Sequence, residues 1–177
     1  MKRIVMTMVV CVCLAAPILA QAPTTPPKPG VEHKRLEFFV GQWTFEGTEK
    51  PSPFGPGGKF SGTETSKWFP GGFFVVSQTE AKGPTGSHTG RSTMGYNPQE
   101  KVYTVHMINS AGEEVYARGN VEGKTWTFTN DGTMGGKPYK GRFTMTETSP
   151  TSYDMVFELA TDGGPFQVMM EGKATKK

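Results

Sequence analysis

The chain has little leucine, isoleucine or alanine outside its first twenty residues. From residue 21 onward, Leu36 and Leu159 are the only leucines and Ile108 is the only isoleucine. Helices of a globular domain need such residues to build apolar stripes that interlock, so a helical domain is excluded. What remains is Phe, Val, Met, Tyr, Trp and Thr in short alternating runs, separated by glycine, proline, asparagine and aspartate. This composition predicts an all-β protein.

Cysteine is equally scarce, since Cys11 and Cys13 are the only two. Both lie in residues 1–20, where Lys2 and Arg3 precede an apolar run typical of an export signal. We expect cleavage after Ala20, and an uncleaved N-terminal anchor is the alternative. The mature chain would then have no disulfide, no thiolate nucleophile and no cysteine-bound metal. Its localisation would be periplasmic or extracellular.

The chain also lacks a large excess of charge of either sign. Loss of the signal peptide takes the formal net charge from +3 to +1. This balance gives no nucleic-acid footprint, and the mature chain has no expected transmembrane segment. Residues 21–30 hold four prolines and predict an extended tether. Residues 31–175 are long enough for one domain, and the oligomeric state stays open.

The remaining pattern predicts one short helix followed by ten strands. Leu36, Phe39 and Val40 share a face at helical spacing within Val31–Val40, and Gly41 suits the end of that helix. Period-two alternation then predicts strands over 41–49, 59–69, 73–81, 88–96, 102–109, 114–121, 125–130, 139–147, 152–160 and 166–174. Because the links are short turns, successive strands should pair as an antiparallel meander. Closure into a barrel of roughly ten strands would remove both exposed edges, and a two-sheet sandwich is the alternative.

Several motifs resemble those of a bacterial family of unknown function, DUF1579. They are His33-x-x-Leu36-x-x-Phe39-Val40-Gly41-x-Trp43-x-x-x-Gly47, Gly58-x-x-x-Gly62 with Trp68, Pro70-Gly71-Gly72-Phe73-Phe74, and Gly95-Tyr96-Asn97-Pro98 with Tyr103. The resemblance covers about residues 33–174. It implies a lipocalin-like barrel of the calycin group, distantly similar to nitrobindins and fatty-acid-binding proteins.

Trp43 is predicted to have a structural role. A helix that enters a strand through Gly41 would place the Trp43 ring at the closed end of a barrel, with its N–H near a free carbonyl. Gly47 and Gly62 are expected to permit tight bends of curved strands.

The sequence contains few residues that point to a cofactor, a metal site or catalysis. Nitrobindins hold haem through a histidine near the C-terminus, but residues 152–177 contain no histidine, so no haem or other cofactor is expected. His33, His88 and His106 lack the paired spacing of metal sites, so no metal is expected. Carboxylates such as Glu147 and Glu158 alternate with apolar residues, which predicts a solvated outer face. No catalytic residue is predicted.

Five side chains are predicted to line a cavity, namely Trp68, Arg91, His106, Tyr116 and Arg118. If Arg91 faces inward, it favours an acidic ligand such as a fatty acid; if outward, it is ordinary surface. One residue of register decides between the two.

The sequence is compatible with three functions. The first is an exported calycin-like barrel that binds a small apolar or amphipathic ligand. The second is an envelope scaffold or interaction domain with a packed interior. The third is an enzyme that uses the cavity, for which His106 with Glu114 or Arg118 is the pair to inspect.

Overall fold

The computed structural model describes residues 27–52, 55–134 and 136–177. The predicted signal peptide and most of the predicted tether lie outside these residues. The elements in chain order are α1 (Val31–Arg35), η1 (Leu36–Phe39), β1 (Gly41–Glu49), β2 (Gly58–Trp68), β3 (Phe74–Gly83), β4 (Gly86–Asn97), β5 (Val102–Asn109), β6 (Glu114–Glu122), β7 (Thr125–Met134), β8 (Lys137–Ser149), β9 (Ser152–Thr161) and β10 (Gln167–Lys176).

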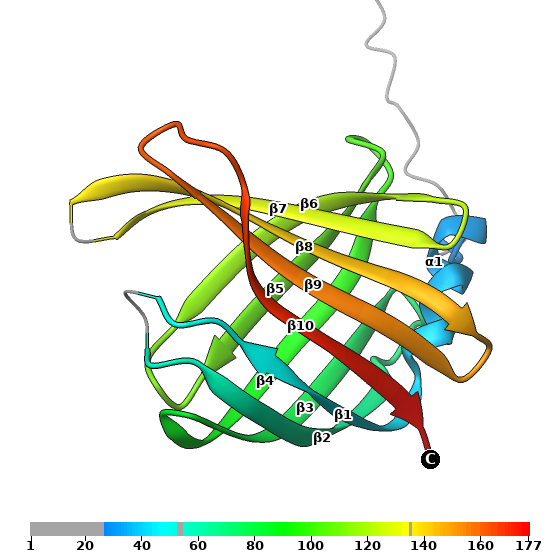
Figure 1. Cartoon of the computed structure of the whole chain (residues 1–177). Helices are drawn as coiled ribbons and strands as arrows, with labels where there is room; N and C mark the ends of the chain where they lie inside the picture. The colour runs from blue at the N-terminus through cyan, green and yellow to red at the C-terminus, as the bar shows by residue number, and fades with distance from the viewer. Residues whose placement is uncertain (1–26, 53–54, 135) are drawn as a thin grey trace, which may run out of the picture.

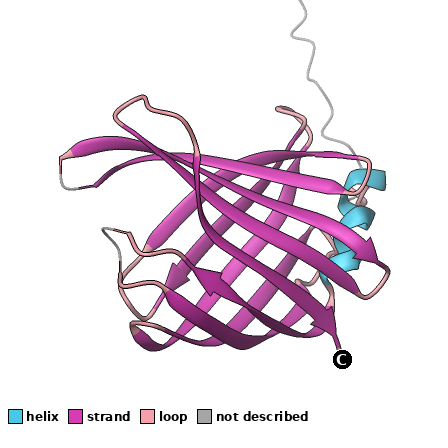
Figure 2. Ribbon diagram, viewed as in Figure 1, coloured by secondary structure: helices cyan, strands magenta, loops and turns pink. Residues whose placement is uncertain are grey.

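The ten strands form one closed antiparallel barrel, in which each strand pairs with its neighbours in sequence and β1 pairs with β10. Figure 1 shows the strands curling around a common interior, and Figure 2 shows how little of the chain is helical. The predicted all-β meander and its closure are therefore confirmed, and the sandwich is wrong. Closure satisfies the hydrogen bonds that two edge strands would otherwise leave exposed.

The short helical segment covers one end of the barrel (Figure 1). It begins as an α-helix and tightens into a 3-10 helix at Leu36. Leu36 and Phe39 are buried, as their helical spacing predicts. The buried Trp43 donates its indole N–H to the Phe39 carbonyl oxygen at 2.8 Å, which confirms the structural role predicted for this ring. We call this end of the barrel interior, which Leu36, Phe39 and Trp43 fill, the plugged half.

Strand register divides the side chains into an inner and an outer set. Along β9, Tyr153, Met155 and Leu159 face inward and are buried, whereas Asp154 is exposed. Arg142 on β8 and Glu158 on β9 face each other on the outer surface and form a bidentate pair with distances of 2.6 and 2.8 Å. The pairing of inner with inner positions holds around the barrel.

Two glycines allow aromatic rings to lie flat against the inner wall. A Cβ at Gly62 would lie 2.4 Å from Cζ of Phe45 on the neighbouring strand, and one at Gly47 would lie 2.5 Å from Cζ of Phe60. Neither distance is compatible with a side chain. Close approach of a ring, in addition to the predicted strand curvature, therefore requires glycine at these positions.

Candidate functional site

Four of the five predicted cavity residues lie on the outer surface. Arg91 is exposed, and its neighbours across the sheet are Gln78 and Ile108, which are also exposed. Tyr116 is 65% exposed, and Arg118 forms an ion pair with Glu100 at 2.8 Å in solvent. The prediction that these side chains line a cavity is therefore wrong, and of the two orientations left open for Arg91 the structure shows the outward one. An outward Arg91 also removes the basis for an acidic ligand.

His106 is the fourth of these residues, and it does meet Glu114. Its Nε2 lies 3.0 Å from Glu114 Oε1, and its ring stacks on Tyr116 with centroids 4.1 Å apart. The hydrogen bond to Glu114 raises the pKa of the Tyr116 hydroxyl. This cluster lies on the outside of β5 and β6, so it does not place two titratable groups within a cavity, as the enzyme hypothesis requires.

Trp68 is the one predicted cavity residue on an inner register position. It pairs with the buried Val75 and packs against the core at the plugged end. Its indole N–H donates to Glu37 Oε2 at 2.5 Å, which ties β2 to η1. Trp68 therefore fixes the plug and does not reach the far half of the interior.

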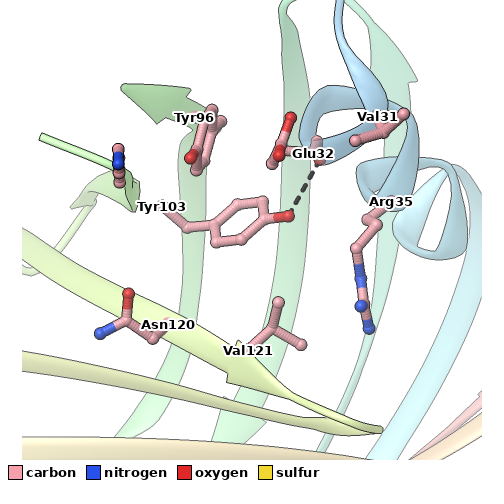
Figure 3. Close-up of a pocket in the computed structure, with 8 residues that line it drawn as sticks. Val31, Glu32, Arg35, Tyr96, Tyr103, Asn120 and Val121 are labelled. Carbon is pink, nitrogen blue, oxygen red and sulfur yellow. Dashed lines mark hydrogen bonds between the residues drawn. The ribbon is translucent and has the colours of Figure 1, made fainter. Parts of the chain in front are cut away.

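Two recesses open on the surface of the barrel. One, of about 470 Å³, lies between α1 and the adjoining barrel end and is shown in Figure 3. There the Tyr103 hydroxyl donates to the Glu32 carbonyl oxygen at 3.0 Å, and burial raises the pKa of that hydroxyl. The second, of about 510 Å³, runs over the outer faces of β2, β3 and β4. Exposed charged side chains line each recess, Arg35 and Lys101 the first and Glu80 the second, so neither is enclosed.

The interior itself differs along its length. Beyond the plugged half, inward-facing side chains remain partly exposed although the barrel wall is closed, which means that solvent enters from the uncovered end. We call this part the open half. Its inward-facing, partly exposed residues are Phe45, Thr79, Ser92, Met107, Val115, Asn130, Tyr139, Phe143, Phe157 and Met170, of which Phe45, Phe143 and Met170 also pack against the buried core. Aromatic and methionine side chains with a few polar groups are the usual lining of small-molecule sites.

A carboxylate lies where the plugged half meets the open half. Glu64 faces inward from β2, beside Trp43 on β1 and Thr79 on β3. Its two oxygens accept hydrogen bonds from the Ser66 hydroxyl at 2.9 Å and the Thr79 hydroxyl at 3.1 Å, and Ser66 also contacts the Ser77 hydroxyl at 2.7 Å. The hydroxyls fix the orientation of the carboxylate without neutralising it.

Glu147 is a second inward carboxylate, contrary to the outer position predicted for it. It accepts the indole N–H of the buried Trp126 at 2.7 Å, a bond that anchors the plugged half. Nearby, Tyr153 packs on Trp43 with centroids 5.1 Å apart. Burial, and to a smaller degree the charge of Glu64, raises the pKa of the Tyr153 hydroxyl.

The sequence does hold a signal for Glu64. Phe60 and Trp68 are the large apolar residues of β2, and both sit an even number of positions from Glu64. Period two therefore assigns Glu64 and Ser66 to the inner face, where a carboxylate between two aromatics would have been informative.

The part of the chain that the structure describes holds neither a metal site nor a membrane-spanning helix. Among residues 27–52, 55–134 and 136–177, no three His, Cys, Asp or Glu side chains converge as a metal site would need. None of the described helices has the length and apolar character needed to cross a membrane.

Comparison with solved structures shows the same fold. The crystal structure of Rv2717c from M. tuberculosis superposes with a TM-score of 0.59 at 11% identity, covering 84% of this chain and 98% of that one. The S-type phycobiliprotein lyase CPES from Guillardia theta gives a TM-score of 0.51 at 9% identity, covering 81% and 90%. At such identities the likeness concerns fold alone.

No curated protein matches the chain. A family described as "Protein of unknown function (DUF1579)" matches residues 28–176. The match spans the entire barrel and confirms the resemblance carried by the sequence motifs. The chain belongs to the DUF1579 family.

Proposed function

We propose that this protein is an exported barrel that binds a small amphipathic molecule in the open half of its interior. One observation carries the proposal: inward-facing apolar side chains such as Met107 and Phe157 remain partly exposed inside a closed wall. Covering such side chains stabilises a complex by about 25 cal/mol per Å² of apolar surface removed from water. A ligand with an apolar body therefore gains free energy there.

The site has the ordinary composition of a binding pocket. Rings and thioethers supply most of the lining, and isolated polar groups such as Asn130, Tyr139 and Glu64 supply direction. Asn130 Nδ2 donates to the Tyr139 hydroxyl at 3.3 Å, so two of these groups already hold each other in place. A pre-formed lining lowers the entropy lost on binding.

Export is the second part of the proposal and rests on residues 1–20. Cleavage after Ala20 would leave Gln21 as the first mature residue. Intact-mass measurement of the protein from the extracytoplasmic fraction of its host tests this. A mass that includes residues 1–20 would contradict cleavage.

The ligand itself is tested by native mass spectrometry of protein purified from its own host. We expect an adduct of small-molecule mass that is released on unfolding. A titration with a panel of amphiphiles, followed by thermal shift, provides the second readout. A protein that carries no adduct and shows no shift with any member of the panel would contradict the binding function and favour the scaffold role.

A further inference from the structure

We propose that the polar end of the ligand is a protonated amine and that Glu64 receives it at the floor of the open half. This inference rests on the proposed function and specifies its ligand class. The observations that carry it are the position of Glu64, the unused hydrogen-bonding capacity beside it, and the charges that face the interior.

Glu64 sits at the boundary between the two halves. Trp43, the residue opposite it on β1, is 1% exposed and closes the plugged side, whereas Thr79, opposite it on β3, is partly exposed to the interior. A molecule that enters through the uncovered end therefore meets Glu64 at its deepest point. The Ser66 and Thr79 hydroxyls take one lone pair on each oxygen, and a carboxylate can accept about four hydrogen bonds.

Glu64 has no cationic partner in the described chain. None of the ion pairs found among the described residues includes it. The nearest inward cation across the sheet is Lys176, whose Nζ lies 5.0 Å from the centre of the Trp43 ring and interacts with that ring instead. A carboxylate held inside a barrel without a counter-ion favours a ligand that brings one.

Tyr153 supplies a second polar atom for the same ligand. Its side chain is 8% exposed, and its hydroxyl makes no hydrogen bond to any other described residue. Ala174, the residue opposite Tyr153 on β10, is fully buried and small, so the phenol ring reaches across it to Trp43, the neighbour of Glu64. An ammonium group has three hydrogens, enough to donate to Glu64 and to the Tyr153 oxygen together.

Two lysines at inward register positions already have partners, Lys137 in Asp162 and Lys176 in the Trp43 ring, so the remaining interior charges favour the same sign of ligand. Glu49 and Glu147 also occupy inward register positions. The arginines on described strands, Arg91, Arg118 and Arg142, all face outward. An anionic head group would meet carboxylates at the floor, so a fatty acid is disfavoured by like charge.

The test uses three probes that share one chain length: dodecylamine, dodecanol and dodecanoate, each titrated below its critical micelle concentration at pH 7. We expect the mature protein to bind the amine about tenfold more tightly than the carboxylate, because the ammonium donates charge-assisted hydrogen bonds to Glu64 whereas the carboxylate meets a like charge there. Glu64→Gln should weaken amine binding about tenfold while dodecanol affinity stays within about threefold.

Glu171→Gln is the matched control, because it removes the same charge from the exposed outer face of β10. It should change none of the three affinities. Tyr153→Phe provides an independent variant, expected to weaken the amine by about threefold, and it decides the question if Glu64→Gln does not fold.

The outcomes separate this inference from the function on which it rests. Equal affinities for the three probes, or tighter binding of dodecanoate, would overturn the amine assignment while leaving a binding barrel. Equal effects of Glu64→Gln and Glu171→Gln on the amine would also overturn it. Failure of every probe to bind would overturn both proposals.

Discussion

The two halves of the barrel interior are built from the same strands but packed differently. In the plugged half, Trp43, Trp126 and Leu36 are fully buried and belong to one core cluster. In the open half, inward residues such as Met107 and Phe157 keep part of their surface in solvent. The contrast teaches that one short helical segment concentrates stability at one end and leaves the other end free to bind.

The contrast predicts unequal costs for removing an aromatic ring. Trp126→Ala should lower the free energy of unfolding by about 4 kcal/mol, because it empties a fully buried site and leaves Glu147 without its indole partner. Phe157→Ala in the open half should cost only about 1 kcal/mol, since its ring is already partly hydrated. Urea denaturation measures both, and equal costs would break the comparison.

The boundary between the halves is sensitive to added volume. Gly62→Ala should cost about 2 kcal/mol, since the new methyl group would overlap the ring of Phe45 and the Glu80 carbonyl oxygen. In the double variant with Phe45→Ala, part of this cost should disappear, because the ring is then absent. A double-mutant cycle from urea denaturation measures the coupling, and strictly additive costs would show that the ring does not need Gly62.

High pH should loosen the plugged half. The folded-state pKa of Tyr153 is raised above its ordinary value of 10.0, chiefly by burial. The stability that the neutral phenol contributes is thus complete below pH 10 and declines as pH rises beyond it, by about 1.4 kcal/mol per pH unit. Denaturation at several pH values should show a shallower decline for Tyr153→Phe. Identical slopes would indicate that this hydroxyl ionises freely in the folded protein.

Side-chain pairs on the outer surface of the barrel should contribute least to the free energy of unfolding. Glu158→Gln breaks the bidentate pair with Arg142 and should cost no more than about 1 kcal/mol, because Arg142 remains 36% exposed. The pair lowers the pKa of Glu158, so its contribution is present above the ordinary carboxyl pKa and is lost as pH falls below it. Thermal unfolding at pH 7 and pH 3 checks this, and a loss larger than that of Trp126→Ala would contradict the account.

Fold and plug follow from the sequence because their signals are redundant. Alternating apolar residues between turns rich in glycine, proline and asparagine define the strands, and Trp43 lies between a helix and a strand in a position that has few alternatives. The bounds predicted for 41–49 and 102–109 coincide with β1 and β5.

The facing of the predicted site residues was harder to derive. Arg91 alternates with Thr89 and Thr93, which do not fix its face, and a shift of one residue reverses it. Met94 and Tyr96 on the same strand do carry the signal, because they lie an odd number of positions from Arg91 and so assign it to the outer face. On β6 the large Tyr116 faces outward, while the smaller Val115 and Ala117 face the interior. Size therefore predicts the wrong face there. Glu64 was derivable, since Phe60 and Trp68 fix the inner face of β2.

The central claim is that ligands bind inside the open half and not on the wall. Ser92 and Arg91 are adjacent on β4, and the first faces inward while the second is exposed. Fluorescence titration with Nile red, a neutral apolar dye, should therefore show binding to the native protein and to Arg91→Trp, and little or none to Ser92→Trp, whose indole would fill the interior. Equal binding by the two variants, or loss only in Arg91→Trp, would contradict the account.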